Sequence, residues 1–158
     1  MSLGYDRDES NGVHEDESGV RELLKCVLKR FGQVSVNRIH KISFMLEYEY
    51  HEHENKRITN AAYYRVMDGC RSDAISEVLG KLEVIERKKV DISGETIETI
   101  VPQDGIDCNP DVGDTDSFEE IADYVVQTYG DIPPEEINAK MGSIPIYRDT
   151  KLGEKIEF

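Results

Sequence analysis

The sequence predicts an α+β protein that is mainly helical and carries one small β-hairpin. In several segments apolar residues recur at three- and four-residue spacing, which is typical of helices with one buried face. Two runs rich in β-branched residues flank Ser93-Gly94, a dipeptide that favours a tight turn between antiparallel strands. The chain has 158 residues and no run of about 18 apolar ones, so we expect one domain and no membrane span.

The first two helices are predicted from their apolar faces and their capping residues. Ser18 is the expected start of the first helix, which carries an apolar stripe and ends at Gly32. Ser35 is the expected cap of the second helix, which should reach about Glu52. Apolar residues cover more than one face of this second helix. We therefore expect it to lie in the middle of the fold, contacted from two sides.

A strand, a helix and a hairpin are predicted next. Aromatic and β-branched residues at 61–66 favour a short strand, and Asp68-Gly69 marks a turn. Ser72 is suited to cap a helix, and the hairpin follows at 84–101. The order helix, helix, strand, helix, hairpin is the one expected of a winged helix. We therefore predict a winged-helix-like core over residues 18–101.

The C-terminal part is predicted to be a loop, two helices and an extended segment. Pro, Gly and Asp dominate residues 102–116, and the pair Ser117 and Glu120 has the spacing of a capping box. A second, shorter helix is expected to begin around Pro133 and Pro134. Alternating apolar and polar residues in the last stretch favour an extended segment on the surface.

The chain is expected to consist of a tail and one domain. Residues 1–17 are acidic and poor in apolar side chains, so they are expected to be a disordered tail. Residues 18–158 are expected to form a single domain, in which residues 102–158 add the C-terminal helices to the winged-helix-like core. The polar N-terminus does not resemble a secretory signal, and we predict a cytoplasmic protein.

The net charge of −14 restricts the partners of the protein. Residues 1–18 carry −5, residues 19–101 carry +1 and residues 102–158 carry −10. Such acidity argues against non-specific binding to phosphate backbones and favours solubility or a basic protein partner. The nearly neutral middle of the chain nevertheless leaves room for a local basic patch.

No residue pattern typical of catalysis or of cofactor binding occurs in the sequence. Nucleophile elbows and glycine-rich phosphate loops are both missing. His51 and His53 would point to different sides of a helix, because a two-residue step turns about 200°. We interpret them as part of a frayed, solvated helix end and not as metal ligands. We thus expect no catalytic residues, no cofactor and no metal, and a protein that is not an enzyme.

The three cysteines predict no disulfide framework. Cys26, Cys70 and Cys108 are far apart in the sequence and odd in number. We expect reduced thiols, most of them buried.

Four basic residues are candidates for contact with a partner or with nucleic acid. Arg87, Lys88 and Lys89 lie on the first hairpin strand, and Arg71 precedes the adjoining helix. They could meet DNA phosphates in the way that a wing does. However, adjacent strand residues point to opposite faces, and acids lie nearby in the sequence. A solvated hairpin that binds an acidic patch of a protein is an equally good interpretation.

Taken in order, these segments resemble the SocA-like Panacea antitoxin domain. Residues 34–44 resemble the opening helix of that family, in which a Lys lies between apolar positions ahead of aromatic ones. Residues 58–69 are similar to its strand that leads into a glycine, and residues 72–82 to its next helix. Near the C-terminus, residues 129–137 and 144–150 resemble its Tyr-Gly-Asp helix start and its closing segment. The resemblance covers about residues 20–156.

The resemblance implies a non-enzymatic antitoxin that binds and neutralises a cognate toxin protein. In one branch of the family, the antitoxin is a proteolytic adaptor that delivers its toxin to a AAA+ protease. Partner contacts do not carry over residue by residue, because the shared motifs look structural. The alternative function, suggested by the helix and hairpin order, is a winged-helix DNA-binding transcriptional regulator.

Overall fold

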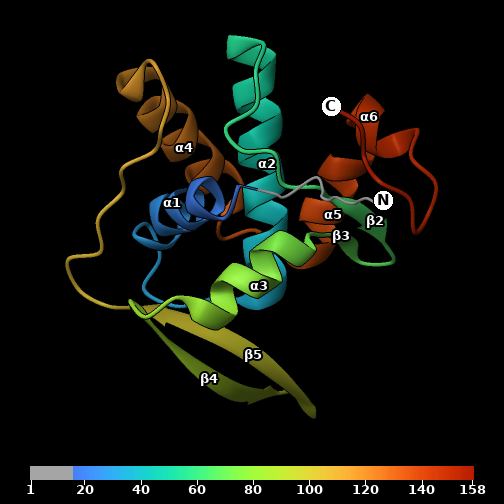
Figure 1. The fold of residues 1–158 in the computed structure, drawn as a ribbon. Helices are drawn as coiled ribbons and strands as arrows, with labels where there is room; N and C mark the ends of the chain where they lie inside the picture. Colours follow the sequence, from blue (N-terminus) through green and yellow to red (C-terminus); the bar gives the residue numbers. More distant parts are fainter. Residues whose placement is uncertain (1–15) are drawn as a thin grey trace, which may run out of the picture.

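A computed structural model describes residues 16–158 as a mixed α+β fold built around one long helix, α2 (Figure 1). Six helices, a three-stranded antiparallel sheet and a two-stranded hairpin make up this part of the chain. The predicted α+β class is thereby confirmed. In chain order the elements are α1 (Glu17–Leu28), β1 (Val34–Ser35), α2 (Val36–Glu54), β2 (Tyr64–Val66), β3 (Gly69–Arg71), α3 (Asp73–Lys81), β4 (Ile85–Ile92), β5 (Glu95–Pro102), α4 (Thr115–Tyr129), α5 (Pro134–Gly142) and α6 (Pro145–Arg148).

Helix α2 is the two-sided core helix that the sequence predicts. In Figure 1 α1 and α4 flank it on one side, and α5, α6 and the β2–β3 hairpin flank it on the other. Its cap is Ser35, as predicted, whose hydroxyl accepts a hydrogen bond from the Arg38 N–H at 3.1 Å. The helix ends at Glu54, two residues later than predicted, where Asn55 adopts the left-handed conformation.

Helix α1 starts earlier than its sequence suggests. Asp16 and not Ser18 is the N-cap, because the Asp16 carboxylate accepts a hydrogen bond from the Gly19 N–H at 3.0 Å. The predicted disordered tail at 1–17 lies outside the described residues except for its last two, which form this helix start.

The main sheet has the order β1–β5–β4, and all its neighbours are antiparallel. The predicted hairpin is confirmed: Ser93 and Gly94, with φ of 51° and 84°, form a two-residue turn between β4 and β5. Strand β1 pairs Val34 and Ser35 with Ile100 and Thr99 of β5, which ties the hairpin to the base of α2.

A second hairpin replaces the predicted single strand at 61–66. Only Tyr64–Val66 is a strand, and it pairs with the unpredicted strand Gly69–Arg71. Between the two strands, Met67 and Asp68 form the turn, and Gly69 has a φ of +130°, a conformation that side chains rarely allow. A β-carbon at this position would lie 2.8 Å from the Lys41 ε-carbon, so the missing side chain also makes room for a lysine.

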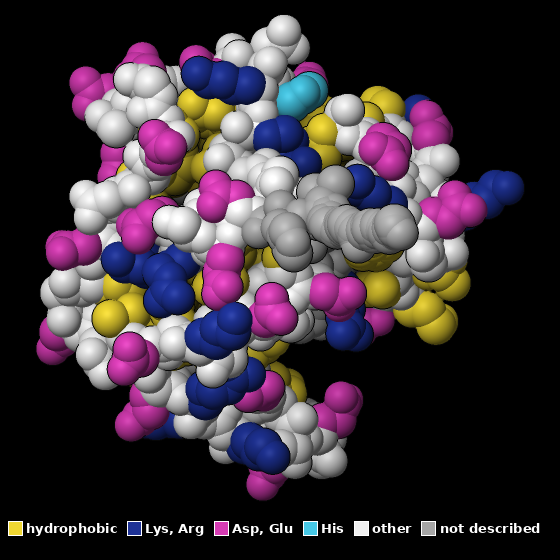
Figure 2. Space-filling model, viewed as in Figure 1, with side chains coloured by type: hydrophobic (Ala, Val, Ile, Leu, Met, Phe, Trp, Pro, Cys, Tyr) yellow, Lys and Arg dark blue, Asp and Glu magenta, His cyan; other side chains and the backbone are white. Residues whose placement is uncertain are grey.

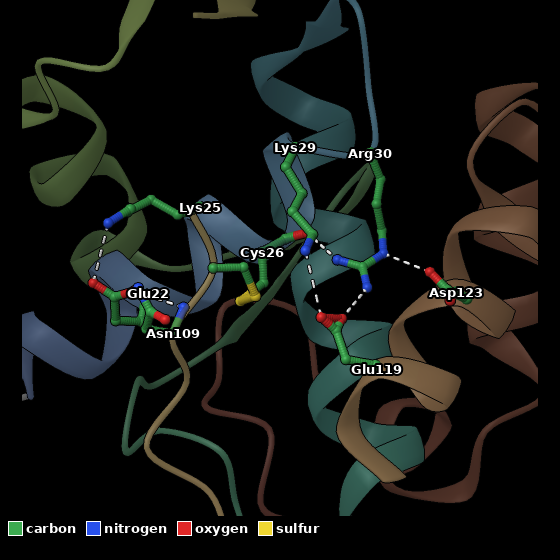
Figure 3. The surroundings of a disulfide bond; sticks show 9 residues. Glu22, Lys25, Cys26, Lys29, Arg30, Asn109, Glu119 and Asp123 are labelled. Carbon is green, nitrogen blue, oxygen red and sulfur yellow. Dashed lines mark hydrogen bonds and ion pairs between the residues drawn. A yellow bond between two sulfur atoms is a disulfide. The ribbon is translucent and has the colours of Figure 1, made fainter. Parts of the chain in front are cut away.

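The prediction of three reduced thiols is wrong for two of the cysteines. Cys26 of α1 and Cys108 of the loop before α4 form a disulfide, while Cys70 is a free, buried thiol (Figure 3). Sequence spacing could not reveal this pair, because 82 positions separate its members. The bond attaches the long, acidic loop to the buried side of α1.

Ion pairs beside the disulfide join α1 to α4. The Arg30 guanidinium donates to Glu119 at 2.6 Å and to Asp123 at 2.8 Å, and the Lys29 ammonium lies 3.4 Å from Glu119 (Figure 3). On the loop itself, the Asn109 N–H donates to Glu22 at 3.0 Å. The disulfide and these contacts position α4 and the loop that precedes it.

The end of the chain is more folded than the extended segment that we predicted. Residues 145–148 form the short helix α6, and an isolated bridge then pairs Lys155 with Tyr64. At the C-terminus, the Phe158 ring lies 3.9 Å from the Arg57 guanidinium, and Ile156 is buried. The described helices include none with the length and apolarity required to cross a membrane.

Candidate partner-binding groove

The four basic residues singled out in the sequence are largely matched by carboxylates of the same chain. Arg87 donates to Glu98 at 2.7 Å and to the Leu79 carbonyl at 3.1 Å. The other two pairs are Lys88 with Glu86 at 3.5 Å and Arg71 with Asp73 at 3.3 Å. The Lys89 side chain forms no hydrogen bond or ion pair within residues 16–158, and it lies across the ladder from Glu98. Figure 2 accordingly shows basic and acidic side chains interspersed over the hairpin at the bottom of the view.

The same four residues do not form one surface. Arg87 and Lys89 project from one face of β4 and Lys88 from the opposite face, since side chains alternate along a strand. Arg71 precedes α3, whereas Arg87 contacts Leu79 near the other end of that helix. The six helical steps of 1.5 Å from Asp73 to Leu79 alone separate these positions by roughly 9 Å along the axis. A ligand on the hairpin would therefore meet two of these basic groups at most on one face.

A groove lies beside the same hairpin. It has a volume of about 630 Å³ and lies between the sheet, the start of α2 and the turn from α4 to α5. Ile92 and Ile97 of the hairpin and Phe31, Val34 and Pro134 of the body give it an apolar lining. Ile92 is 52% exposed, so part of this apolar lining is open to solvent.

Arg38 fixes one wall of this groove. Its guanidinium donates to the carbonyl oxygens of Gly130 at 2.9 Å and Ile132 at 2.7 Å, and it lies 3.4 Å from that of Tyr129. These are the free carbonyls at the end of α4 and in the turn that follows. Arg38 therefore holds the α4–α5 turn against the base of α2.

Strand β5 offers an open edge along the groove. All eight of its residues pair with β4 on one side, but β1 pairs only with Thr99 and Ile100 on the other. Within the described residues, no third strand continues β1 beside 95–98. The backbone groups on that edge can accept an added strand.

A small recess opens from the inner end of the groove. It shares Ser35, Asn37, Arg38 and Pro134 with the groove and adds Lys41 and Ile137. The recess has a volume of about 20 Å³, room for about one water molecule. In the sequence, the signal of this recess is a lysine between the apolar positions Ile39 and Ile42 on a core helix.

Lys41 lines that recess and has no counter-ion at hydrogen-bonding distance within residues 16–158. Its side chain is 1% exposed, and no group among residues 16–158 accepts a hydrogen bond from its ammonium. Burial lowers the pKa of Lys41, while the carboxylates of Asp68 and Glu135 act in the opposite direction from a distance. Even the amide oxygen of Asn138, which faces Gly69 as the Lys41 stem does, has no hydrogen-bond partner among the described residues.

His51 and His53 lie in the last turn of α2, so this end is helical and not frayed, whereas His53 is exposed to solvent as predicted. The His53 ring is 3.9 Å from Glu49, and the His51 ring packs 6.0 Å from that of Phe158. No group of three potential metal-binding side chains occurs in the described part of the chain.

His40 of α2 is a buried histidine in the core. Its Nδ1 accepts a hydrogen bond from the Ser72 N–H at 3.1 Å, at the cap of α3. Burial, reinforced by the charge of Arg71, lowers the pKa of His40 to about 4, so the ring is neutral at pH 7. His40 therefore joins α2 to α3 as an acceptor.

Comparison with known proteins found no relative of this chain. No family model matches the chain, and neither a curated protein nor a solved structure matches it. The resemblance to the SocA-like Panacea antitoxins stays a prediction.

Proposed function

We propose that this chain is a non-enzymatic, antitoxin-like cytoplasmic protein that binds a cognate toxin protein and neutralises it. The observation that carries the proposal is the groove of about 630 Å³ with an apolar lining, the exposed Ile92 and the open edge of β5 beside it. Such an edge binds an extended polypeptide through backbone hydrogen bonds, and apolar subsites select its side chains. The groove is thus suited to a protein partner, which is the kind of partner that the resemblance implies.

Co-expression with the product of the neighbouring gene tests the proposal. We expect the two proteins to purify as a complex, and growth arrest by the toxin to be relieved. Exchange of Ile92 for Asp should weaken the complex at least about tenfold, since it places a charge on an apolar contact. Exchange of the exposed Leu152 for Asp, far from the groove lining, is the matched control. A toxin that is verified as toxic but neither bound nor neutralised would refute the proposal.

In a proteolytic adaptor, the same complex would also be presented to a AAA+ protease. That role is an extension of the proposal and makes a separate prediction. The toxin should be degraded by the purified protease only when this chain is present, and the chain itself should survive several turnovers. Neutralisation without degradation would leave direct inhibition as the mechanism.

Binding to DNA is the second candidate function. Its support is the winged-helix-like order of α3 and the β4–β5 hairpin, together with Lys89, which forms no ion pair within residues 16–158. In this case the protein should bind its own promoter with an affinity that falls steeply with salt and with the exchange of Lys89 for Ala. An affinity that changes neither with salt nor with the exchange of Lys89 for Ala would exclude DNA binding as the function. The carboxylates beside Arg71, Arg87 and Lys88 make this candidate the weaker one.

A further inference from the structure

Residues 103–114, the loop from β5 to α4, are weakly attached to the rest of the fold, and in Figure 1 they run outside α1. None of these residues is buried, and the four that are half-buried are Ile106, Cys108, Pro110 and Val112. Within the described part of the chain, one hydrogen bond connects positions 104–113 to another segment, from the Asn109 N–H to Glu22 at 3.0 Å. Segments with so few buried contacts and hydrogen bonds open locally with a low free energy.

The disulfide from Cys108 to Cys26 is the strongest attachment of this loop (Figure 3). Cys26 lies at the margin of the buried side of α1, because Glu22 and Arg30, four positions before and after it on the same flank, are polar. Its side chain is nevertheless 0% exposed. The loop that carries Cys108 therefore covers this flank of α1 and shields the Cys26 sulfur from solvent.

The charges of the loop favour its release once the covalent bond is absent. The loop carries four aspartates and no Lys or Arg, and carboxylates three or four residues apart repel one another. Lys29 and Arg30 of α1 pair with Glu119 of α4 and not with the loop. No ion pair within residues 16–158 involves the loop aspartates, which are Asp104, Asp107, Asp111 and Asp114.

Both ends of the loop are held by contacts that do not involve the disulfide. Pro102 belongs to β5, where it lies opposite Ile85, and the Asp114 side chain caps α4. Helix α4 is joined to α1 by the Arg30 guanidinium, which lies 2.6 Å from the Glu119 carboxylate. Loss of the disulfide therefore frees the middle of the loop and leaves the helices and strands in place.

We infer that the Cys26–Cys108 disulfide is a redox switch, which a dithiol reductant opens so that the 103–114 loop leaves the flank of α1 while the rest of the fold persists. Opening exposes Cys26 and the apolar side chains of Ile106 and Val112. Oxidation by a small disulfide closes the loop again. This inference goes beyond the proposed function and does not depend on it.

The exchange begins at Cys108, because its sulfur is the less buried of the two. One thiolate of the dithiol attacks this sulfur, the bond between the cysteines breaks, and Cys26 leaves as a thiolate that takes up a proton. The second thiolate of the reductant then attacks the mixed disulfide, which releases Cys108 as a thiol and leaves the reductant as a cyclic disulfide. Two electrons and two protons thus pass from the dithiol to the protein.

Alkylation of the folded chain tests the inference. The full chain is reduced with dithiothreitol, freed of reductant without air and treated with iodoacetamide, and mass spectrometry follows each cysteine. The internal control is Cys70, a thiol on β3 that is 2% exposed and reports opening of the whole fold. We expect Cys26 to react at least about tenfold faster than Cys70, because only the loop has opened.

Two variants separate the disulfide from the reductant. In Cys108→Ser the bond cannot form, so Cys26 should react without dithiothreitol and as fast as in the reduced natural chain. Cys70→Ser is the matched control, since it removes a cysteine that is not part of the switch, and its Cys26 should still react only after reduction.

Proteolysis provides a readout that does not use thiols. Residues 103–114 contain four aspartates but no site for trypsin. After reduction, an aspartate-specific protease should cleave between positions 104 and 114 at least about tenfold faster, because cleavage follows the open population. The rate of trypsin cleavage elsewhere in the chain should change less than about twofold.

Two kinds of result would overturn the inference. If Cys26 of the reduced chain reacts as slowly as Cys70, the loop stays closed without its disulfide. If Cys70 reacts as fast as Cys26, or trypsin cleavage accelerates as much as cleavage at aspartate, reduction opens the whole fold and not the loop.

Discussion

At the scale of single residues, the polar side chains buried on α2 attach the segments around it. The Glu47 carboxylate, fully buried, accepts hydrogen bonds from the Ile58 N–H at 2.8 Å, the Thr59 N–H at 3.2 Å and the Arg57 guanidinium at 2.9 Å. His40 contacts α3 in a similar way. Because the chain itself satisfies Glu47 and His40, we assign both side chains to folding.

His40 makes stability dependent on pH in a predictable direction. Its pKa is about 4 in the folded protein and about 6.5 when unfolded, so only the unfolded state takes up a proton between these values. Stability from this group is complete above pH 7 and falls as the pH drops from 6.5 towards 4. We expect a loss of about 2 kcal/mol in the free energy of unfolding between pH 7 and pH 5, measured by urea denaturation.

The exchange of His40 for Asn provides the control for that measurement. The Asn side-chain oxygen can accept the Ser72 hydrogen bond, as Nδ1 does now, but it does not titrate. The variant should lose about 2 kcal/mol less than the natural chain over the same pH interval. An equal loss in both proteins would assign the pH dependence to other groups.

At the scale of elements, apolar spacing predicted the helices well and their starts less well. The periodicity that located α1 and α4 contains no information on which acceptor reaches the free N–H groups. Asp16 and Asp114 act as the caps, and the predicted Ser117 donates its own N–H to Asp114 at 3.0 Å. Strand β3 and helix α6 were missed because three or four residues are too short to display a period.

The groove could not be predicted from the sequence, for a different reason. Its lining comes from three distant segments, 31–38, 92–99 and 130–134, and only the sheet register and Arg38 bring them together. The hairpin that carries Arg87, Lys88 and Lys89 also contributes Ile92 and Ile97 to the groove.

The disulfide between α1 and the long loop makes a prediction at this scale. Under non-reducing conditions the denatured chain should contain one reactive thiol, Cys70, and after reduction it should contain three. Reduction should lower the free energy of unfolding by about 2–4 kcal/mol, because the bond closes a loop of more than 80 residues in the unfolded chain. Guanidinium denaturation with and without dithiothreitol measures the change.

The variant Cys108→Ser is the control for the disulfide. It should have the stability of the reduced natural chain and should not respond to dithiothreitol. Three reactive thiols in the untreated protein would contradict the bond between Cys26 and Cys108. In the folded state we expect Cys70 to resist alkylation, since burial raises the pKa of its thiol.

At the scale of the whole molecule, two parts of the family resemblance meet in space. The lysine of the opening helix, Lys41, and the glycine that ends the quoted strand segment, Gly69, lie in direct contact, with the lysine stem where a β-carbon would otherwise be. In the sequence they are separate motifs 28 positions apart. In the fold they form one unit, because a buried lysine stem at this place requires a residue without a side chain.

The net charge of −14 predicts how the whole fold responds to salt. Repulsion among so many carboxylates opposes the compact state, and ions screen it over about 10 Å at 0.1 M. Salt also weakens favourable ion pairs such as Lys81–Glu17, but exposed pairs of this kind contribute less than about 1 kcal/mol each. We expect the excess charge to dominate, so the free energy of unfolding should rise by about 1 kcal/mol, and the melting temperature by roughly 3 °C, between 0.02 and 0.3 M NaCl at pH 7.5.

Acidification gives the control for this last prediction. Near pH 4.7 the charges of the sequence sum to zero, and the rise with salt should then disappear although the ions are the same. Calorimetry across the salt series at both pH values separates screening from a general effect of salt on water, since only screening depends on the net charge. A rise of equal size at both pH values, or a fall at pH 7.5, would contradict the prediction. A fall would mean that the local ion pairs joining α1 to α4 outweigh the repulsion of the whole chain.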